Sequence, residues 1–296
     1  MTETFVAAEI ARQPDVWRQA VEVAKVNAEL LPAAGARVAV VGCGTSWFMA
    51  QAYAARREAL GQGETDAFVA SEYPEGRNYY LLIAITRSGT TTEVLDLLGR
   101  LRGKARTLAV IGDPDSPGVG AADSAILLPF ADEQSVVQTR YATAALTLLR
   151  ASLGEDLDGL IAEAERVVEW EVPAEVLERT QFTYLGRGMA YGLANEAALK
   201  LREAAVAWAE SYPSMDWRHG PKAIQDTNSV VTLLGEQPSG LPQEAASTGA
   251  IVQQWDEDPQ HTLVRCQKLA VALSLKKGFN PDQPRNLTRS IILEDA

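Results

Sequence analysis

The sequence predicts an α/β protein in which a parallel sheet is built twice along the chain. Residues 81–85 are apolar without interruption and lead into a hydroxyl-rich turn, which is typical of a buried parallel strand that continues into a helix. Strand and helix patterns alternate through the first half of the chain. A strand with a Gly-x-Gly turn occurs at 37–44 and returns at 182–188. We therefore expect two domains, over residues 1–153 and 154–296.

The first half reads as one such domain. Apolar residues at spacings of three and four predict an amphipathic surface helix over residues 9–31. The strand at 37–41 then passes through a glycine turn into a helix at 47–60. Further strands are predicted at 66–70, 79–85, 105–111 and 124–128, and further helices at 93–101 and 136–153. Such an alternation predicts a parallel sheet covered on both faces, with ligands bound beyond the carboxyl ends of its strands.

Two turns, at residues 42–46 and 86–91, are expected at this edge and can converge on one anion. The first N–H groups of a helix lack intrahelical partners and the helix dipole is positive there, so these turns suit a phosphate monoester. Arg87 can add a positive charge. The hydroxyl donors of the second turn are Thr86, Ser88 and Thr91.

Both turns have an alternative interpretation. Thr90, Thr91 or Thr92 can simply cap the following helix, and Arg87 can point to solvent. Residues 42–44 also match the start of a dinucleotide-binding fingerprint, with Asp66 at about the distance of a ribose-binding acid. Trp47, however, occupies the third glycine position of that fingerprint, where close packing of helix on strand needs the smallest residue. NAD binding is therefore disfavoured.

The second half repeats the fold without repeating the hydroxyl groups. A charged, helical segment at 156–180 connects the halves, and a strand at 182–188 and a helix at 190–207 follow. The strand at 229–234 ends in Gly-Glu-Gln-Pro, which contains an acid and no hydroxyl group. The second half is thus free to supply chemistry instead of phosphate binding.

Three charged residues of the second half lie on one helix face. Glu196, Lys200 and Glu203 are spaced four and three apart, which is also the spacing of an ordinary ion ladder on a surface. The rest of this helix, up to Trp208, is largely apolar, so we expect the helix to be buried and its charges to be paired or functional. His219, in a loop before Gly-Pro, is a candidate acid or base, with a structural hydrogen bond as the alternative. His261 is expected to be solvated.

Composition excludes several classes of partner. The net charge is −12 and the pI about 4.8, which disfavours binding of nucleic acid or of an anionic membrane. Cys43 and Cys266 lie far apart and form no CxxC pair, so we expect a reducing compartment and neither a zinc site nor a disulfide. The sequence shows no leader pattern and no apolar run of spanning length, from which we expect a soluble, cytoplasmic protein.

At several motifs the chain resembles the doubled SIS (sugar isomerase) domain. This domain occurs in the isomerase half of glucosamine-6-phosphate synthase, in stand-alone phosphosugar isomerases and in amino-sugar-phosphate deaminases. The motifs occur in the family order over nearly the whole chain, and they are specific jointly rather than singly. They are Cys-Gly-Thr-Ser at 43–46, Thr-Arg-Ser-Gly-Thr-Thr at 86–91, Val-Gln-Thr-Arg at 137–140, Glu-Ala-Ala-Leu-Lys-Leu-Arg-Glu at 196–203, His-Gly-Pro at 219–221 and the tail at 282–290.

The resemblance implies two tandem, flavodoxin-like SIS domains and a role for each motif. It implies that Ser46, Thr86, Ser88 and Thr91 bind the phosphate of a six-carbon sugar phosphate, with Gln138 near the sugar. Glu203 matches the acid that moves a proton between C1 and C2, Lys200 matches a lysine close to the reacting oxygens, and His219 matches the residue that helps to open the ring. In relatives that histidine reaches the neighbouring subunit, so a homodimer is implied. The chemistry needs no metal or redox cofactor.

The chain also departs from the synthase. It begins at the helix linked to the SIS domain, so glutamine-dependent synthesis would need a separate amidotransferase. Arg289 stands where the synthase has an imine-forming lysine; a guanidinium cannot serve as that nucleophile but can clamp a phosphate or an oxyanion. Arg87 and Thr90 replace a glutamine and a glutamate, which makes the turn more positive. Two function classes remain open: an isomerase or deaminase with Glu203 as base, and a sensor that only binds the sugar phosphate.

Overall fold

The computed structural model describes residues 4–293, which form two compact units with one parallel sheet each. The N-lobe contains Arg12–Glu133, Gln138–Ile161 and the tail, residues 288–293. The C-lobe contains residues 4–11, Gln134–Val137 and Ala162–Leu287. The predicted α/β fold with two parallel sheets is confirmed. The boundary that we expect after residue 153 stays a prediction. Residues 4–11 belong to the C-lobe, which the second half of the chain mainly forms, and residues 288–293 belong to the N-lobe, which the first half mainly forms.

The N-lobe sheet has five strands in the order β2-β1-β3-β4-β5, and every pair is parallel. This is the flavodoxin-like order, in which the chain first adds a strand on one side of β1 and then continues on the other. Each crossover carries the chain back to the same edge, so all carboxyl ends lie together. The strands are β1 (Val38–Gly42), β2 (Thr65–Val69), β3 (Leu81–Thr86), β4 (Thr107–Ile111) and β5 (Ser124–Leu127).

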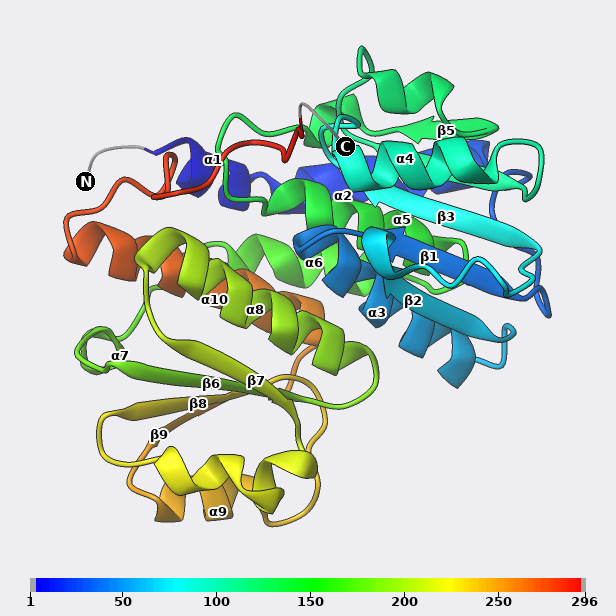
Figure 1. Ribbon diagram of the computed structural model, residues 1–296. Coiled ribbons are helices and arrows are strands. Elements are labelled where there is room, and N and C mark those ends of the chain that lie inside the picture. Colours follow the sequence, from blue (N-terminus) through cyan, green and yellow to red (C-terminus); the bar gives the residue numbers. More distant parts are fainter. Residues whose placement is uncertain (1–3, 294–296) are drawn as a thin grey trace. The chain divides into compact units, whose positions relative to one another are not determined.

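Helices cover both faces of this sheet (Figure 1). Alternate residues of β1 and β3 face α4, where Ala39, Val41 and Leu82 pack against Leu97 and Leu98. The intervening residues of these strands are buried as well, which is why the strands are apolar without interruption. The helices of this lobe are α2 (Gln13–Val26), α3 (Thr45–Ala59), α4 (Thr92–Leu101) and α5 (Arg140–Ala151), and the chain leaves the lobe within α6 (Asp158–Val167).

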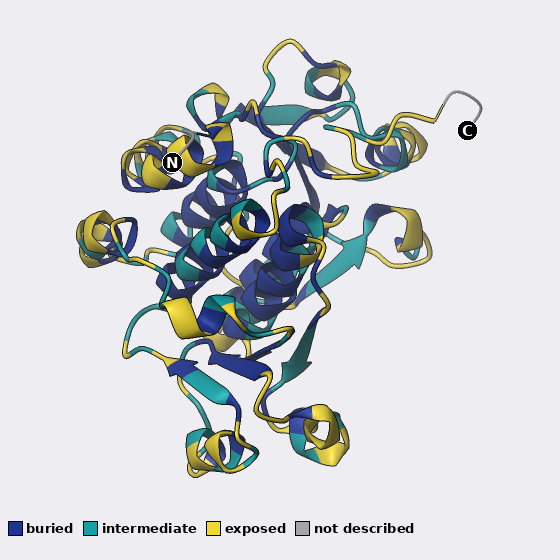
Figure 2. Cartoon of the chain, turned by 90° about the vertical axis from the view of Figure 1, so that its left-hand side faces the viewer, coloured by how far each residue is buried: buried dark blue, intermediate teal, exposed yellow. Residues whose placement is uncertain are grey.

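The C-lobe sheet repeats the first four strands in the order β7-β6-β8-β9. Helix α8 packs between the sheet and α10, and α9 lies on the other face (Figure 1). Figure 2 shows several helices and strands mostly in the colour of buried residues, whereas other strands have the colour of intermediate ones. The strands are β6 (Gln181–Gly186), β7 (Ala209–Pro213), β8 (Ser229–Leu233) and β9 (Ile251–Gln254). The helices are α1 (Phe5–Ala11), α7 (Ala174–Leu177), α8 (Met189–Ala205), α9 (Leu241–Ser247) and α10 (Pro259–Lys276).

Three local predictions are wrong. The single helix expected over 9–31 is two helices, because Pro14 lies in the first turn of α2 and a proline cannot continue a preceding helix. Trp208 lies beyond α8, which ends at Val206 in a left-handed conformation, and the tryptophan is 74% exposed. His261 is only 3% exposed, because its polar neighbours form the capped start of α10, a helix that packs against α8.

Candidate active site

The β3–α4 turn, residues 86–91, is held in shape by hydrogen bonds to two of its own hydroxyl groups. Gly89 adopts a φ of 60°, a conformation that suits glycine, and its N–H donates to Thr86 Oγ1 at 3.2 Å. The N–H of Thr90 donates to Ser88 Oγ at 3.2 Å. Thr91 is the N-cap of α4, but its side chain makes no capping hydrogen bond. The plain-capping alternative is therefore wrong for Thr91, whose hydroxyl group is not used by the helix.

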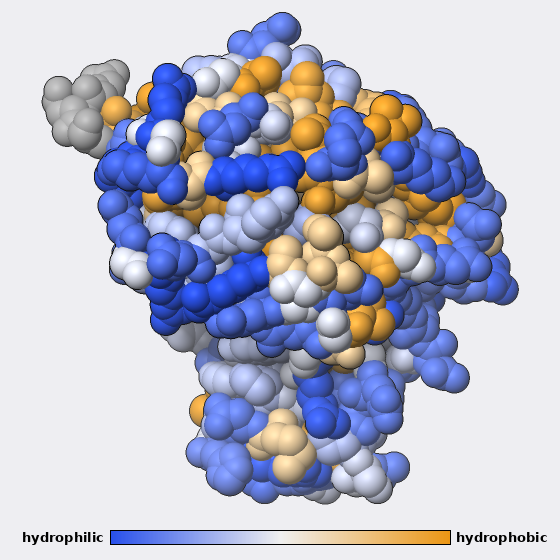
Figure 3. All heavy atoms as spheres, turned by 90° about the vertical axis from the view of Figure 1, so that its right-hand side faces the viewer, coloured by the Kyte–Doolittle hydropathy of each residue, from blue (hydrophilic) through white to orange (hydrophobic). Residues whose placement is uncertain are grey.

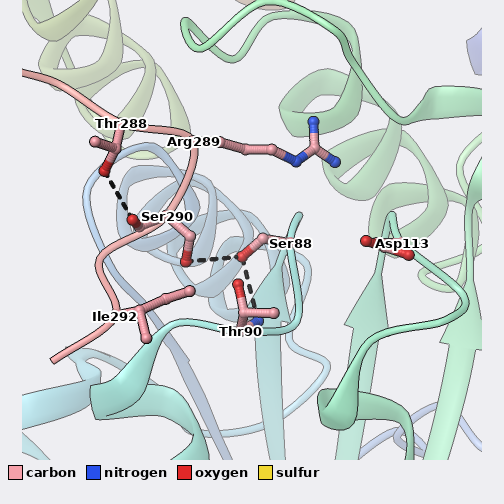
Figure 4. A pocket seen from close by; sticks show the side chains of 7 residues that line it. All are labelled: Ser88, Thr90, Asp113, Thr288, Arg289, Ser290 and Ile292. Atoms are coloured by element: carbon pink, nitrogen blue, oxygen red, sulfur yellow. Dashed lines mark hydrogen bonds between the residues drawn. The ribbon is translucent and has the colours of Figure 1, made fainter. Parts of the chain in front are cut away.

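The tail lies on this turn. Ser88 Oγ donates to Ser290 Oγ at 3.1 Å (Figure 4). Thr91 Oγ1 lies 3.4 Å from the same oxygen. Backbone contacts continue along the tail, because the N–H of Thr92 donates to the carbonyl of Ile291 at 3.2 Å. The N–H of Leu293 returns a bond to Thr92 Oγ1 at 2.9 Å. Two of the predicted phosphate-binding hydroxyl groups thus meet at a hydroxyl group of the chain itself.

Arg87 does not point to solvent. Its side chain is 1% exposed and lies 3.6 Å from the carboxylate of Glu133, which is also fully buried. Glu133 Oε1 accepts the N–H of Thr139 at 2.6 Å and of Arg140 at 2.8 Å, at the start of α5. The guanidinium of Arg87 also donates to the carbonyl of Arg289 at 3.0 Å. The solvent-facing alternative is wrong, and Arg87 ties the turn to α5 and to the tail; a role in phosphate binding stays a prediction.

Arg289 is held by the carboxylate of Asp132, which directly precedes Glu133 in the chain. Its Nη2 donates to both oxygens of Asp132, at 2.7 and 2.8 Å, and its Nη1 donates to the carbonyl of Glu133. Such a fork of two bonds fixes the guanidinium in direction as well as in position. Arg289 therefore anchors the tail, and its positive charge is opposed by Asp132.

The turn, the tail and the loop after β4 surround an open pocket of about 340 Å³ (Figure 4). This volume lies at the lower end of the range for small-ligand sites. The lining consists of Ser88, Thr90, Asp113, Thr288, Arg289, Ser290 and Ile292. The apolar side chains of the tail beside it are half-exposed, and Figure 3 shows hydrophobic side chains interspersed with hydrophilic ones on one face of the molecule.

Of the predicted N-lobe site residues, Ser88 and Arg289 belong to this lining, whereas Ser46, Thr86, Arg87, Thr91 and Gln138 lie outside it. Ser46 is buried in the first turn of α3, at the end of β1, which pairs with β3. Gln138 directly precedes Thr139, the N-cap of α5, and its buried Oε1 has no hydrogen-bond partner among residues 4–293. Burial raises the pKa of Cys43, next to the β1–α3 turn, to about 11, so this thiol is neutral at physiological pH.

The charged residues of α8 form a buried chain. Lys200 Nζ lies 3.4 Å from Glu196 and donates to Glu203 Oε2 at 2.5 Å. The side chains of Glu196 and Lys200 are 0% and 1% exposed, whereas that of Glu203 is 19% exposed. The surface-ladder alternative is therefore wrong. Of the two carboxylates, Glu203 is the one that a ligand can reach, and it lies beside a cation.

His219 is exposed at the end of a 3-10 helix, Asp216–His219, of the C-lobe, whereas Trp217 of the same helix is buried. The residues around it are tied to α9: Arg218 Nε donates to Glu244 Oε2 at 2.6 Å, and Lys222 Nζ donates to Glu244 Oε1 at 2.8 Å. Hydrogen bonds from Lys222 and Arg218 lower the pKa of Glu244, which therefore stays ionised. One carboxylate thus holds the loop on both sides of His219.

Four residues of these arrangements were missed by the sequence reasoning: Asp113, Asp132, Glu133 and Glu244. Each is an acidic residue in a loop or a short helix, where charge is ordinary and periodicity carries no signal. The one available hint was position, since Asp113 follows a predicted buried strand at the edge where ligands bind.

Over residues 4–293 no group of three or more His, Cys, Asp and Glu side chains is arranged to hold a metal ion. Within the same range no helix combines the length and the apolar character that crossing a membrane requires.

Comparison with known proteins places the fold. No family model matches the sequence. The chain is 28% identical to the glutamine–fructose-6-phosphate aminotransferase [isomerizing] of Nostoc sp. (strain PCC 9229), over 87% of this chain and 52% of that protein. The chain thus spans about half the length of the curated relatives that it matches.

Two solved structures cover the whole fold. Glucosamine-6-phosphate deaminase from Thermotoga maritima superposes with a TM-score of 0.83 at 24% identity, over 98% of this chain and all of that one. Tagatose-6-phosphate ketose/aldose isomerase from Escherichia coli superposes with a TM-score of 0.78 at 19% identity, over 100% and 98% of the two chains. The predicted tandem SIS fold and the resemblance to the double-SIS phosphosugar isomerases are confirmed.

Proposed function

We propose that this chain with the double SIS fold is a phosphosugar aldose–ketose isomerase or an amino-sugar 6-phosphate deaminase. Its substrate is a hexose or hexosamine 6-phosphate, and Glu203 transfers the proton. The observation that carries the proposal is the chain of charges on α8, in which a reachable carboxylate lies 2.5 Å from a buried ammonium group. The names of the matched relatives, which describe isomerising, deaminating and aldose–ketose enzymes, support the same class.

The chemistry follows from these two groups. An aldose–ketose shift removes the proton from C2, passes through an enediolate and returns a proton to C1. Glu203 takes and returns this proton, and the ammonium of Lys200 stabilises the negative charge that develops on the oxygens. In a deaminase the same shift turns a C2 amine into an imine, and addition of one water releases ammonia and leaves the ketose.

Phosphate binding is assigned to the N-lobe. Hydroxyl groups of Ser88 and Thr91, with those of Ser46 and Thr86, donate to phosphate oxygens at the start of α4 and α3. Ser290 already interacts with two of these groups, so the phosphate takes its place or shares the site with it. Arg87, which is buried against Glu133, stabilises the turn. Gln138 contacts the sugar, and Arg289 anchors the tail at the pocket.

Deuterium exchange tests the proposal. The enzyme is incubated in D₂O with a panel of hexose and hexosamine 6-phosphates, and label at C1 and C2 is followed by NMR. We expect exchange with at least one sugar, slowed by a factor on the order of 10²–10⁴ in Glu203→Gln. Glu175→Gln, an exposed change in the same lobe, serves as the control and keeps the wild-type rate. Ammonia release then separates a deaminase from an isomerase. Thermal protection by sugar phosphates without any exchange would instead establish the binding-only sensor.

We also propose a homodimer in which His219 serves the neighbouring subunit and helps to open the sugar ring. Mixed dimers of His219→Ala and Glu203→Gln chains test this assignment. If the histidine acts across the dimer, each mixed dimer contains one complete site, and an equal mixture regains about a quarter of the wild-type activity. No recovery, in a mixture shown to exchange subunits, would mean that both residues act within one chain.

A further inference from the structure

The pocket of the N-lobe contains a charge that the described chain does not neutralise. Two residues of its lining are charged, Arg289 and Asp113, and Arg289 is bound to Asp132. The carboxylate of Asp113 accepts one hydrogen bond, from the N–H of Asp115 to Oδ1 at 3.1 Å. Within residues 4–293 its Oδ2 accepts no hydrogen bond, and the carboxylate forms no ion pair.

The backbone at Asp113 is fixed to the β3–α4 turn. Its N–H donates to the carbonyl of Arg87 at 3.0 Å, and its own carbonyl accepts Ser116 Oγ at 2.8 Å. The contact is tight, because a Cβ added at Gly89 would lie 2.0 Å from Ser116 Oγ. Figure 4 shows Asp113 on the other side of Ser88 from Ser290 and Ile292. The backbone of Asp113 is therefore fixed beside the turn, and its carboxylate is oriented by the N–H of Asp115.

A carboxylate at this place opposes the binding of a plain phosphate. A phosphate monoester is itself an anion, and like charges in a partly enclosed site repel each other. The two nearby guanidinium groups do not remove this repulsion, because Arg87 lies against Glu133 and Arg289 lies against Asp132. The pocket therefore favours a ligand that brings a cation together with its phosphate.

We propose that Asp113 is a specificity-determining residue that binds a protonated amine of the sugar phosphate. The inference rests on the proposed function, since it places the phosphate of the same ligand at the β3–α4 turn. The ammonium group donates to Oδ2 of Asp113 and cancels the charge of the carboxylate. Amine-bearing sugar phosphates are therefore selected over their hydroxyl counterparts. A divalent metal ion shared by Asp113 and the phosphate is the competing source of positive charge.

Calorimetric titration with two unreactive ligands tests the inference. Glucitol 6-phosphate and 2-amino-2-deoxyglucitol 6-phosphate differ only in the hydroxyl or amine at C2, and neither has a carbonyl group to isomerise. At about pH 6.5, where the amine is protonated, we expect the wild type to bind the amine roughly fivefold more tightly. Asp113→Asn loses this preference and binds glucitol 6-phosphate as well as the wild type or better. Asp115→Asn, an exposed change in the same loop, keeps the preference.

Each other outcome has a defined meaning. Equal affinities in the wild type, or a preference that survives in Asp113→Asn, overturn the inference and leave the proposed function intact. A preference that appears only with Mg²⁺ and disappears with EDTA overturns it in favour of the metal ion. If neither alditol phosphate binds, the proposed function fails as well, because the β3–α4 turn then binds no sugar phosphate.

Discussion

The two Gly-x-Gly turns of this protein have nearly the same backbone conformation but are followed by different side chains. Gly44 and Gly188 have nearly equal dihedral angles, φ 54° and ψ −122° against φ 53° and ψ −127°. In the N-lobe the helix then begins with Thr45 and Ser46, whereas in the C-lobe it begins with Met189 and Ala190. The repeated backbone therefore serves the strand-to-helix connection, and side chains alone decide which copy offers hydroxyl groups to an anion.

The loops that carry candidate functional residues differ in a second way. In the N-lobe a buried carboxylate, Glu133, holds Arg87 beneath the β3–α4 turn. In the C-lobe a partly exposed carboxylate, Glu244, holds Arg218 and Lys222 around His219. Removing one partner of a buried pair leaves an uncompensated charge, whereas water solvates the charge that is left at an exposed pair. Loss of a partner should therefore cost more in the N-lobe than in the C-lobe.

The largest effect on stability is expected from breaking the buried ion pair between Arg87 and Glu133. Arg87→Ala leaves Glu133 as an uncompensated buried charge, and we expect it to lower the free energy of unfolding by about 3–5 kcal/mol. Arg77→Ala removes an exposed pair with Asp66 and is the matched control, with a loss below about 1 kcal/mol. Urea unfolding measures both. Equal losses in the two variants would contradict the argument from burial.

Glu133→Gln separates the effect of charge at the Arg87–Glu133 pair from its effect on the fold. The amide keeps the shape and an acceptor for the N–H groups of Thr139 and Arg140, but it frees the positive charge of Arg87 beneath the turn. Phosphate binding should then tighten, whereas in Arg87→Gln, where only the negative charge remains, it should weaken. Calorimetry with inorganic phosphate gives the sign. A weakening in both variants would mean that the pair acts only through the fold.

The shared backbone predicts equal losses from a methyl group at the first glycine of each turn. A Cβ at Gly42 would lie 2.6 Å from the backbone of Ser46, and one at Gly186 would lie 2.3 Å from the backbone of Ala190. Gly42→Ala and Gly186→Ala should each destabilise the protein by about 1–3 kcal/mol in urea unfolding. Gly99→Ala, in α4 with open space around it, should instead stabilise it by up to about 1 kcal/mol. A loss at only one of the two turns would argue against a common geometry.

The difference in chemistry predicts an effect on affinity. Ser88→Ala removes a hydroxyl donor from the β3–α4 turn and should weaken binding of inorganic phosphate about tenfold, since a hydrogen bond to a charged group contributes about 1.5 kcal/mol or more. Ser214→Ala removes a buried hydroxyl group after β7, where it bonds to Gln237. It should leave phosphate affinity unchanged. Calorimetry with both variants checks this, and equal weakening would place the anion elsewhere.

The smallest effect is expected at the partly exposed ion pairs that Glu244 forms with Arg218 and Lys222. Glu244→Gln removes the charge that holds Arg218 and Lys222, and it should cost less than about 1 kcal/mol at neutral pH. The pKa of Glu244 is lowered in the folded protein, so its stabilisation is present above the ordinary carboxyl pKa and is lost as the pH falls through the folded value. Urea unfolding at about pH 7 and about pH 3 should therefore show the variant and the wild type converging in acid. A loss that stays the same in acid would not come from this charge.

Much of the fold follows from local pattern, because a parallel strand buried on both faces leaves an unbroken apolar run. Residues 81–85 and the two Gly-x-Gly turns were enough to predict two parallel sheets, although the strands β7 and β9 of the second sheet were not predicted. The burial of Lys200 was also predictable, since the residues around it on α8 are almost all apolar. The split of the first helix at Pro14 was readable as well, and His261 was misjudged because a helix cap has the composition of a loop.

The strands of the first sheet, two of the four strands of the second, the positions of the hydroxyl groups and the helix with buried charge are all predictable from the sequence, since each of these depends on neighbours within a few positions. Contacts between residues that are distant in the chain, in contrast, become visible only in the folded protein. Arg87 meets Glu133, and Ser88 meets Ser290, across 46 and 202 residues. No local periodicity encodes such pairs. They exist because the parallel strands bring their ends to one edge of the sheet, and because the tail returns to the lobe in which the chain's first sheet is formed.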